Sequence, residues 1–73
     1  MSDIQIIRTM EELEALDPET VTIDNEGTIE SVSEWLDDSG KAYPYDKCFL
    51  PAAVLATGDQ VRAAREAMEL DNG

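Results

Sequence analysis

The chain has 73 residues, with 17 acidic and 5 basic side chains, no histidine and a formal net charge of −12. A chain of this length buries only about 60% of its unfolded surface, so we expect residues 1–73 to form a single small domain with a thin core. No apolar run approaches the roughly 20 residues of a membrane span, and the first residues lack the pattern of a secretory signal. The lone Cys48 cannot form an internal disulfide, which favours a reducing compartment and predicts a cytoplasmic protein.

The negative charge is concentrated in the first half of the chain. Residues 1–38 carry 12 acids and one base, whereas residues 39–73 carry 5 acids and 4 bases. This balance argues against direct binding of a nucleic acid or an anionic membrane, because both require Lys and Arg near phosphate groups. Three interpretations stay open: a surface for a basic partner, a device for solubility, and adaptation to a high-salt cytoplasm.

The first elements are predicted from short local signals. Residues 3–7 form a β-branched run that is typical of a strand. Thr9 and Glu12 have the spacing of a capping box and predict the start of a short helix, which ends before Pro18. The apolar stripe of that helix consists of Met10, Leu13 and Leu16.

A hairpin is expected next. Residues 20–24 alternate in polarity, residues 25–27 have turn chemistry, and residues 28–29 resume the strand pattern. The rest of the segment 28–38 is ambiguous, because its apolar residues fit both the two-residue period of a strand and the period of a helix. We favour a strand there, with a helix as the alternative.

The second half of the chain is predicted as loop, strand and helix. We expect a loop over Asp37–Lys47 and a core strand over Cys48–Leu55. The hydrogen-bonded part of that strand begins after Pro51 or lies at a sheet edge. A helix is expected over Gln60–Leu70, with Asp59 as its N-cap. The helix has an apolar stripe and two i, i+4 ion pairs: Val61, Ala64 and Met68; Arg62–Glu66 and Arg65–Glu69. The fold class is therefore α+β: a small antiparallel sheet, made of a hairpin plus one or more further strands, with a short N-terminal and a longer C-terminal helix.

The composition does not favour catalysis. Histidine, the commonest general base and metal ligand, is missing, and Cys48 beside apolar neighbours is expected to be a buried, inert thiol. Residues 24–27 superficially resemble the start of a calcium loop but lack its ligand spacing. We therefore expect no enzyme activity, metal or cofactor.

Acidic and aromatic residues around the hairpin and the following loop are the expected binding surface. Trp35 fits the core or its edge better than the binding surface, and the two tyrosines that flank Pro44 fit either role about equally well. The predicted binding residues are Asp24, Glu26, Glu30, Glu34, Trp35, Asp37, Asp38, Tyr43 and Tyr45.

Several of these segments together resemble small accessory proteins of actinobacterial phages. The segments are Met10–Leu16, Thr20–Asp24 with Glu26–Gly27, Trp35, and Leu50–Leu55. In that family, a short acidic helix leads into a hairpin, a tryptophan and an apolar strand that begins with Leu-Pro-Ala. The resemblance implies a phage-encoded accessory protein in a bacterial cytoplasm and carries over no chemistry. Two departures are the Asp17–Glu19 segment, where a glycine is usual, and the C-terminal helix.

Two functions follow as hypotheses. The first is a non-enzymatic interaction module whose acidic face binds and inhibits a basic host protein, as a DNA mimic does. The second is a structural or assembly protein that self-associates through the C-terminal helix and the Pro51–Leu55 edge, with the acidity serving solubility. Ala63 and Ala67 lie one helical turn apart and allow close helix packing, so a homodimer is possible.

Overall fold

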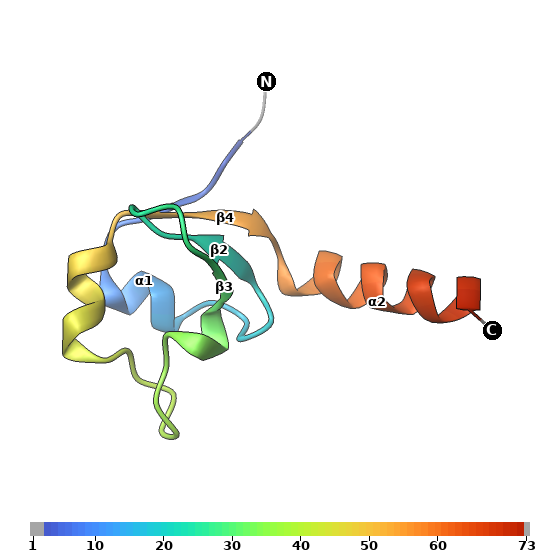
Figure 1. The fold of residues 1–73 in the computed structure, drawn as a ribbon. Coiled ribbons are helices and arrows are strands. Elements are labelled where there is room, and N and C mark those ends of the chain that lie inside the picture. Colours follow the sequence, from blue (N-terminus) through green and yellow to red (C-terminus); the bar gives the residue numbers. More distant parts are fainter. Residues whose placement is uncertain (1–2, 73) are drawn as a thin grey trace.

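The computed structural model describes residues 3–72 and has four strands, two α-helices and two 3-10 helices (Figure 1). In chain order these are β1 (Ile6–Ile7), α1 (Met10–Glu14), β2 (Val21–Ile23), β3 (Ile29–Ser31), η1 (Val32–Glu34), η2 (Pro44–Phe49), β4 (Ala52–Ala56) and α2 (Gly58–Asn72). The strands form one sheet in the order β1-β4-β2-β3, and all neighbours are antiparallel. This confirms the α+β fold with a short and a longer helix. Residues 1, 2 and 73 of the predicted domain lie outside the described part.

The predicted capping box starts α1. The Thr9 hydroxyl accepts a hydrogen bond from the Glu12 amide at 3.1 Å, and the Glu12 carboxylate accepts one from the Thr9 amide at 3.1 Å. Hydrogen bonds from the backbone amides of Arg8 and Thr9 lower the pKa of Glu12. Leu13, in the middle of the predicted stripe, is completely buried. Local sequence therefore suffices to place this helix.

The hairpin also forms as predicted. Thr22 lies opposite Glu30, and Ile23 lies opposite Ile29. Gly27 occupies the turn with a φ of +89°, a conformation that residues with a side chain rarely adopt. A bulge shifts the register between β2 and β4 next to Val21.

The prediction of a strand through residues 28–38 is only partly right. Strand β3 ends at Ser31, because the next amides bond to the chain before β2: Val32 donates to the carbonyl of Thr20 at 2.8 Å. Helix η1 follows, and Trp35 at its end is buried in the core. Neither of the two sequence periods continues through the whole segment.

Residues 44–49 differ from the prediction of loop and strand, because they form helix η2. Pro44 stands in the first turn, and the Asp46 carboxylate accepts the Tyr43 amide at 3.0 Å. Cys48 belongs to this helix and is exposed, so the prediction of a buried thiol is wrong. The strand begins after Pro51, as predicted for its hydrogen-bonded part.

The core is small and lies on one side of the sheet. The Trp35 indole donates to the Thr22 hydroxyl at 3.0 Å, which donates in turn to the carbonyl of Glu30 at 3.0 Å. The Phe49 ring meets Trp35 edge to face, with 6.5 Å between centroids. The buried apolar side chains are Ile7, Leu13, Val32, Trp35 and Ala52.

Helix α2 begins one residue before the predicted N-cap. Thr57 and Gln60 exchange hydrogen bonds at its start, so Asp59 lies in the first turn and is not the N-cap. The predicted pairs Arg62–Glu66 and Arg65–Glu69 are wrong as well. Both arginines instead contact carboxylates of the loop before β2. Arg62 pairs with Asp17 and Glu19 of that loop and with Asp59 of α2, and Arg65 pairs with Glu19.

Helix α2 projects away from the rest of the molecule (Figure 1). Between Asp59 and Asp71 only Val61 is partly buried. The radius of gyration is 13.2 Å, against about 11 Å for a compact chain of this length. Within residues 3–72 no helix has both the length and the apolar character that a membrane span requires.

Candidate functional site

Four carboxylates from separate parts of the chain meet around one hollow of about 280 Å³. We call it the acidic hollow. Its lining comes from the hairpin, the end of η1 and helix η2, and consists of Asp24, Thr28, Glu30, Glu34, Tyr45, Asp46 and Phe49. The sequence predicted four of these residues as binding residues: Asp24, Glu30, Glu34 and Tyr45.

The hairpin turn holds the hollow together. The Asp24 carboxylate accepts the amides of Glu26 and Thr28 at 2.9 Å each, which fixes the turn. Asn25 then binds helix η2: its side-chain amide donates to the carbonyls of Cys48 at 3.0 Å and Leu50 at 3.1 Å. Sequence reasoning saw Asn25 only as a turn residue, because its partners are more than 20 positions away.

Asp46 is the lining residue that sequence reasoning missed. It is 4% exposed, and its carboxylate accepts the Tyr43 amide at the start of η2. Burial raises the pKa of Asp46, although the hydrogen bond from Tyr43 opposes this shift. Asp46 lies in a segment that was predicted as a loop, where a buried acid is not expected. The one sequence signal for it is a proline followed two residues later by an aspartate, a spacing typical of a helix start.

The acidic hollow lacks compensating positive charge within residues 3–72. Glu30 has a raised pKa, first because burial removes water from its carboxylate and then because Asp24, Glu34 and Asp46 repel the charged form. The ion pairs between described residues lie elsewhere. They join Arg62 and Arg65 to acids near α2, and Lys41 to Glu14 at 4.0 Å.

Tyr45, which lines this hollow, stacks on Tyr43. The rings of Tyr43 and Tyr45 lie 5.3 Å apart at an interplanar angle of 8°, and Tyr45 is 61% exposed. Burial raises the pKa of Tyr43, with further contributions from Tyr45 and from the carboxylates of Asp37, Asp38 and Asp46. Asp37 and Asp38 therefore extend the negative charge around the tyrosines.

The remaining predicted residues have different surroundings. Trp35 is 2% exposed, so its place in the predicted binding surface is wrong and its core alternative is right. Glu26 is exposed in the hairpin turn and does not line the hollow. The Asp37 carboxylate accepts the amides of Ser39 at 2.8 Å and Lys41 at 3.1 Å, and hydrogen bonds from Ser39 and then Lys41 lower its pKa.

The hollow presents oxygen acceptors and an exposed phenol ring. Among the described residues, no group of three or more acidic, cysteine or histidine side chains has the arrangement to hold a metal ion. Carboxylates in this setting pair with guanidinium and ammonium groups, and an aromatic face stacks on arginine.

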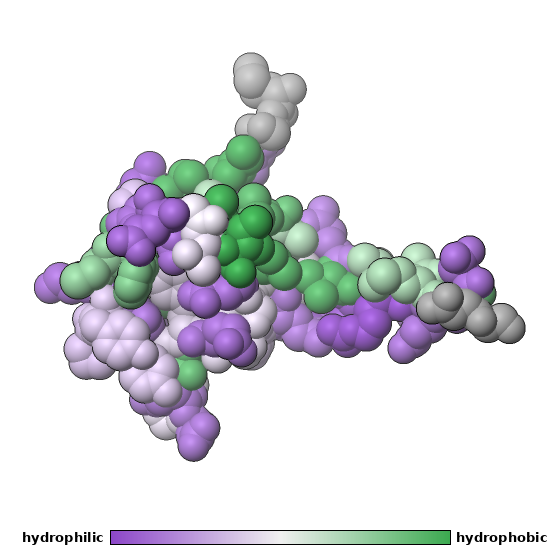
Figure 2. All heavy atoms as spheres, in the orientation of Figure 1, coloured by the Kyte–Doolittle hydropathy of each residue, from purple (hydrophilic) through white to green (hydrophobic). Residues whose placement is uncertain are grey.

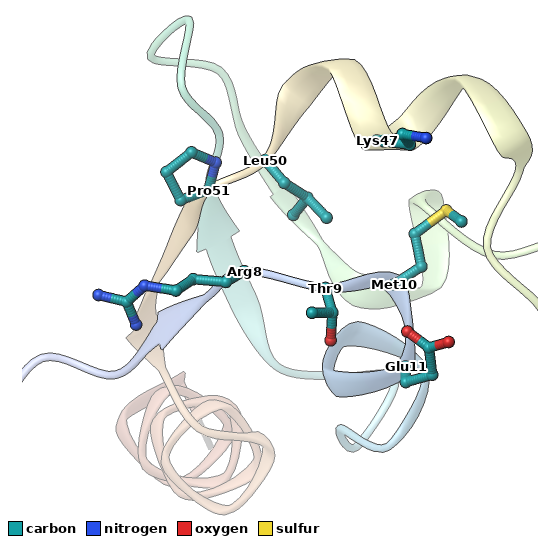
Figure 3. A pocket seen from close by; sticks show the side chains of 7 residues that line it. All are labelled: Arg8, Thr9, Met10, Glu11, Lys47, Leu50 and Pro51. Carbon is teal, nitrogen blue, oxygen red and sulfur yellow. The ribbon is translucent and has the colours of Figure 1, made fainter.

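A second, larger hollow of about 560 Å³ lies between the start of α1 and the end of η2 (Figure 3). Arg8 and Lys47 stand at its rim, and Leu50 and Pro51 supply apolar lining. The Thr9 hydroxyl already accepts the Glu12 amide. This site combines two cations and the Glu11 carboxylate with an apolar wall.

Comparisons of the chain with protein-family models, with curated proteins and with solved structures found no match.

Proposed function

We propose that the chain is a non-enzymatic protein-interaction module whose acidic hollow binds a basic surface of a partner protein. One observation carries this proposal: Asp24, Glu30, Glu34 and Asp46 line a single hollow and have no cation among the described residues to neutralise them. Crowding of like charges costs stability, and an incoming Arg or Lys relieves that cost.

The partner class follows from the chemistry of the hollow. Its carboxylates present acceptors for arginine side chains, and Tyr45 offers an exposed ring beside them. Proteins that bind DNA keep such basic side chains exposed for phosphate, so a DNA-binding protein is the partner that we propose. The resemblance to phage accessory proteins implies an accessory protein in a bacterial cytoplasm, and we propose that binding at the acidic hollow inhibits a host protein there.

Titration with an oligo-arginine peptide tests the charge recognition directly. We expect Glu30→Gln with Glu34→Gln to weaken binding about three- to tenfold, as two partly exposed charge pairs are lost. The matched control is Glu66→Gln with Glu69→Gln on α2, which changes the net charge equally and is expected to alter binding less than about twofold.

The same titration distinguishes a site from general acidity. Equal losses in the two double variants would contradict the proposal, because net charge alone would then explain binding. A duplex DNA oligonucleotide serves as the negative probe and is expected not to bind. A second assay measures release of fluorescent DNA from a basic DNA-binding protein, which the unaltered chain is expected to promote and the hollow variant is expected to promote less.

A further inference from the structure

One face of the sheet is left open by the described chain, except at the end where Val21 and Ser31 line a shared hollow with Val61 of α2. Ile6 and Ile23 both lie opposite Ala53, and Ile23 also lies opposite Ile29. Directly opposed residues share a face, so these side chains form one apolar surface on the side away from Trp35. Ile29 is 60% exposed, and Leu55, two positions after Ala53, is 50% exposed. We call this surface the outer face.

Strand β3 reverses the usual pattern of a two-layer fold. Glu30 lies opposite Thr22, so its side chain leaves the sheet on the side of the core, while its neighbour Ile29 points to the bare side. A sheet normally turns its apolar residues inward and its polar residues to water. Here a continuous apolar surface faces outward, which marks a contact surface.

Helix α2 supplies a second uncovered apolar surface. Val61, Ala64 and Met68 form one stripe at helical spacing. Val61, at the base of the helix, is partly buried, whereas Ala64 is exposed and Met68 is 61% exposed. An isolated helix of about 15 residues is only marginally stable in water, so α2 gains from a contact along its length. Figure 2 shows hydrophobic residues continuing from the sheet region onto α2 on the same side of the molecule.

These two surfaces cannot cover each other within one chain. Arg62 contacts Asp17 at 2.9 Å and Glu19 at 2.8 Å, and Arg65 contacts Glu19 at 2.8 Å. Gly58 lies so close to Asp17 that an added side-chain carbon would stand 2.4 Å from its carboxyl carbon. The base of α2 is thus held against the loop before β2, and the helix points away from the sheet (Figure 1).

We propose that two copies of the chain form a reciprocal dimer, in which α2 of each copy lies on the outer face of the other. The chain itself supplies both halves of the contact, an uncovered sheet face and an uncovered amphipathic helix. A helix of 15 residues is about 22 Å long, and four strands span about 14 Å between their outer axes, so α2 is long enough to cross the sheet.

The symmetry and the charge of the contact fit this occupant. A specific interface buries about 800 Å² on each partner, and a twofold pair supplies two helix-on-sheet contacts toward that area. The paired strand residues of the outer face include no carboxylate, so the contact forms where the strongly acidic chain repels itself least. This inference is independent of the proposed binding at the acidic hollow.

Light scattering after gel filtration tests the dimer, with the complete chain at micromolar concentration. We expect the mass of a dimer. Met68→Glu and Ile29→Lys each place a charge in the contact and are expected to weaken association more than about tenfold, which is about 1.4 kcal/mol. The matched controls are Leu70→Glu and Ser39→Lys, both expected to leave the dimer unchanged within about twofold. Ser39 is exposed in the loop before η2 and belongs to neither the acidic hollow nor the outer face. Leu70 is 77% exposed and lies on nearly the opposite side of α2 from Met68.

Several results would overturn the proposal. One is a monomer at all concentrations up to about the millimolar range, where even a very weak pair forms. Another is a dimer that Met68→Glu dissociates and Ile29→Lys does not, because that pattern belongs to a pair of helices alone. Circular dichroism of each variant shows that it remains folded. Raising the salt from about 50 mM to about 500 mM is expected to strengthen the dimer, since it screens repulsion between two copies of net charge −12.

Discussion

The acidic hollow and the outer face lie on opposite sides of the same sheet, and adjacent residues separate them. Glu30 lines the hollow beside three other carboxylates, while Ile29 lies 60% exposed on the outer face. One region crowds charge that burial and neighbours make unfavourable, and the other leaves apolar area in water. The acidic hollow thus has uncompensated negative charge, and the outer face has exposed apolar area without charge. Successive residues of a strand point to opposite faces of the sheet. In this chain the alternation places charge on one face and apolar side chains on the other, and we propose a contact for each.

The largest expected effect concerns Trp35, which supports both regions. Trp35→Ala removes a side chain that is 2% exposed and its hydrogen bond to Thr22, so we expect a loss of about 3–5 kcal/mol. A small domain has little more stability than this, so most of the chain is expected to unfold. Urea unfolding followed by circular dichroism measures it. Trp35→Phe should retain part of the stability, and a variant as stable as the original chain would contradict the assigned core.

Salt is expected to have opposite effects on the affinities of the two regions for their partners. Binding of an oligo-arginine peptide to the acidic hollow is expected to weaken about tenfold or more between about 50 mM and 500 mM salt, because screening removes the attraction. Dimerisation through the outer face is expected to strengthen over the same range. Titration calorimetry and light scattering on one sample series measure both. Two responses of the same sign would show that a single surface serves both contacts.

Loosening the base of α2 is expected to affect only one region. Three carboxylates raise the pKa of Arg62 further above its ordinary value, so the guanidinium stays charged and holds the helix direction. Arg62→Gln is expected to weaken the dimer a few-fold and to speed amide exchange in α2, with unchanged peptide binding at the hollow. Hydrogen exchange and light scattering check this. Lys47→Gln removes one positive charge as well and serves as the control.

The smallest effect is the pH dependence of Glu30. Its folded-state pKa is raised, so the folded chain binds a proton more readily than the unfolded chain, and the charged form costs stability above that pKa. Glu30→Gln is therefore expected to be more stable than the original chain at pH 7 by roughly 0.5 kcal/mol. The difference should shrink as pH falls from neutral toward the ordinary glutamate pKa of 4.5.

Urea unfolding at a series of pH values measures this difference. Glu66→Gln, on the exposed part of α2, is the control and should show no such trend. A Glu30→Gln variant less stable than the original chain at pH 7 would mean that the carboxylate makes a favourable contact. The hollow would then not be short of positive charge.

Local signals predicted the parts of the fold that depend on neighbours in sequence. Thr9 and Glu12 start α1, and the alternation of residues 20–24 with the turn at Gly27 gives the hairpin. These elements need only bonds between residues a few positions apart. The candidate site was predicted in part for the same reason, since Asp24 and Glu30 belong to one hairpin.

Long-range contacts decided what the sequence left open or predicted wrongly. Asp46 joins the hollow because Asn25 bonds to the carbonyls around η2, and Trp35 enters the core because Thr22 accepts its indole N–H. Arg62 and Arg65 bond to Glu19, more than 40 positions away, and do not form the predicted i, i+4 pairs, although Arg62 also bonds to Asp59 on its own helix. These contacts join residues that are far apart in the sequence, and a periodic pattern does not show which distant residues lie close together in the fold.

By itself, the sequence determined the fold class, the short helix, the hairpin and a strongly acidic chain, because composition and short-range hydrogen bonding set these. Only the tertiary structure decided which carboxylates share one hollow, and that apolar strand residues face outward. The physical reason is the sheet register. It assigns each residue to a face through partners that are distant in sequence, and this assignment separates the charge of Glu30 from the apolar surface of Ile29.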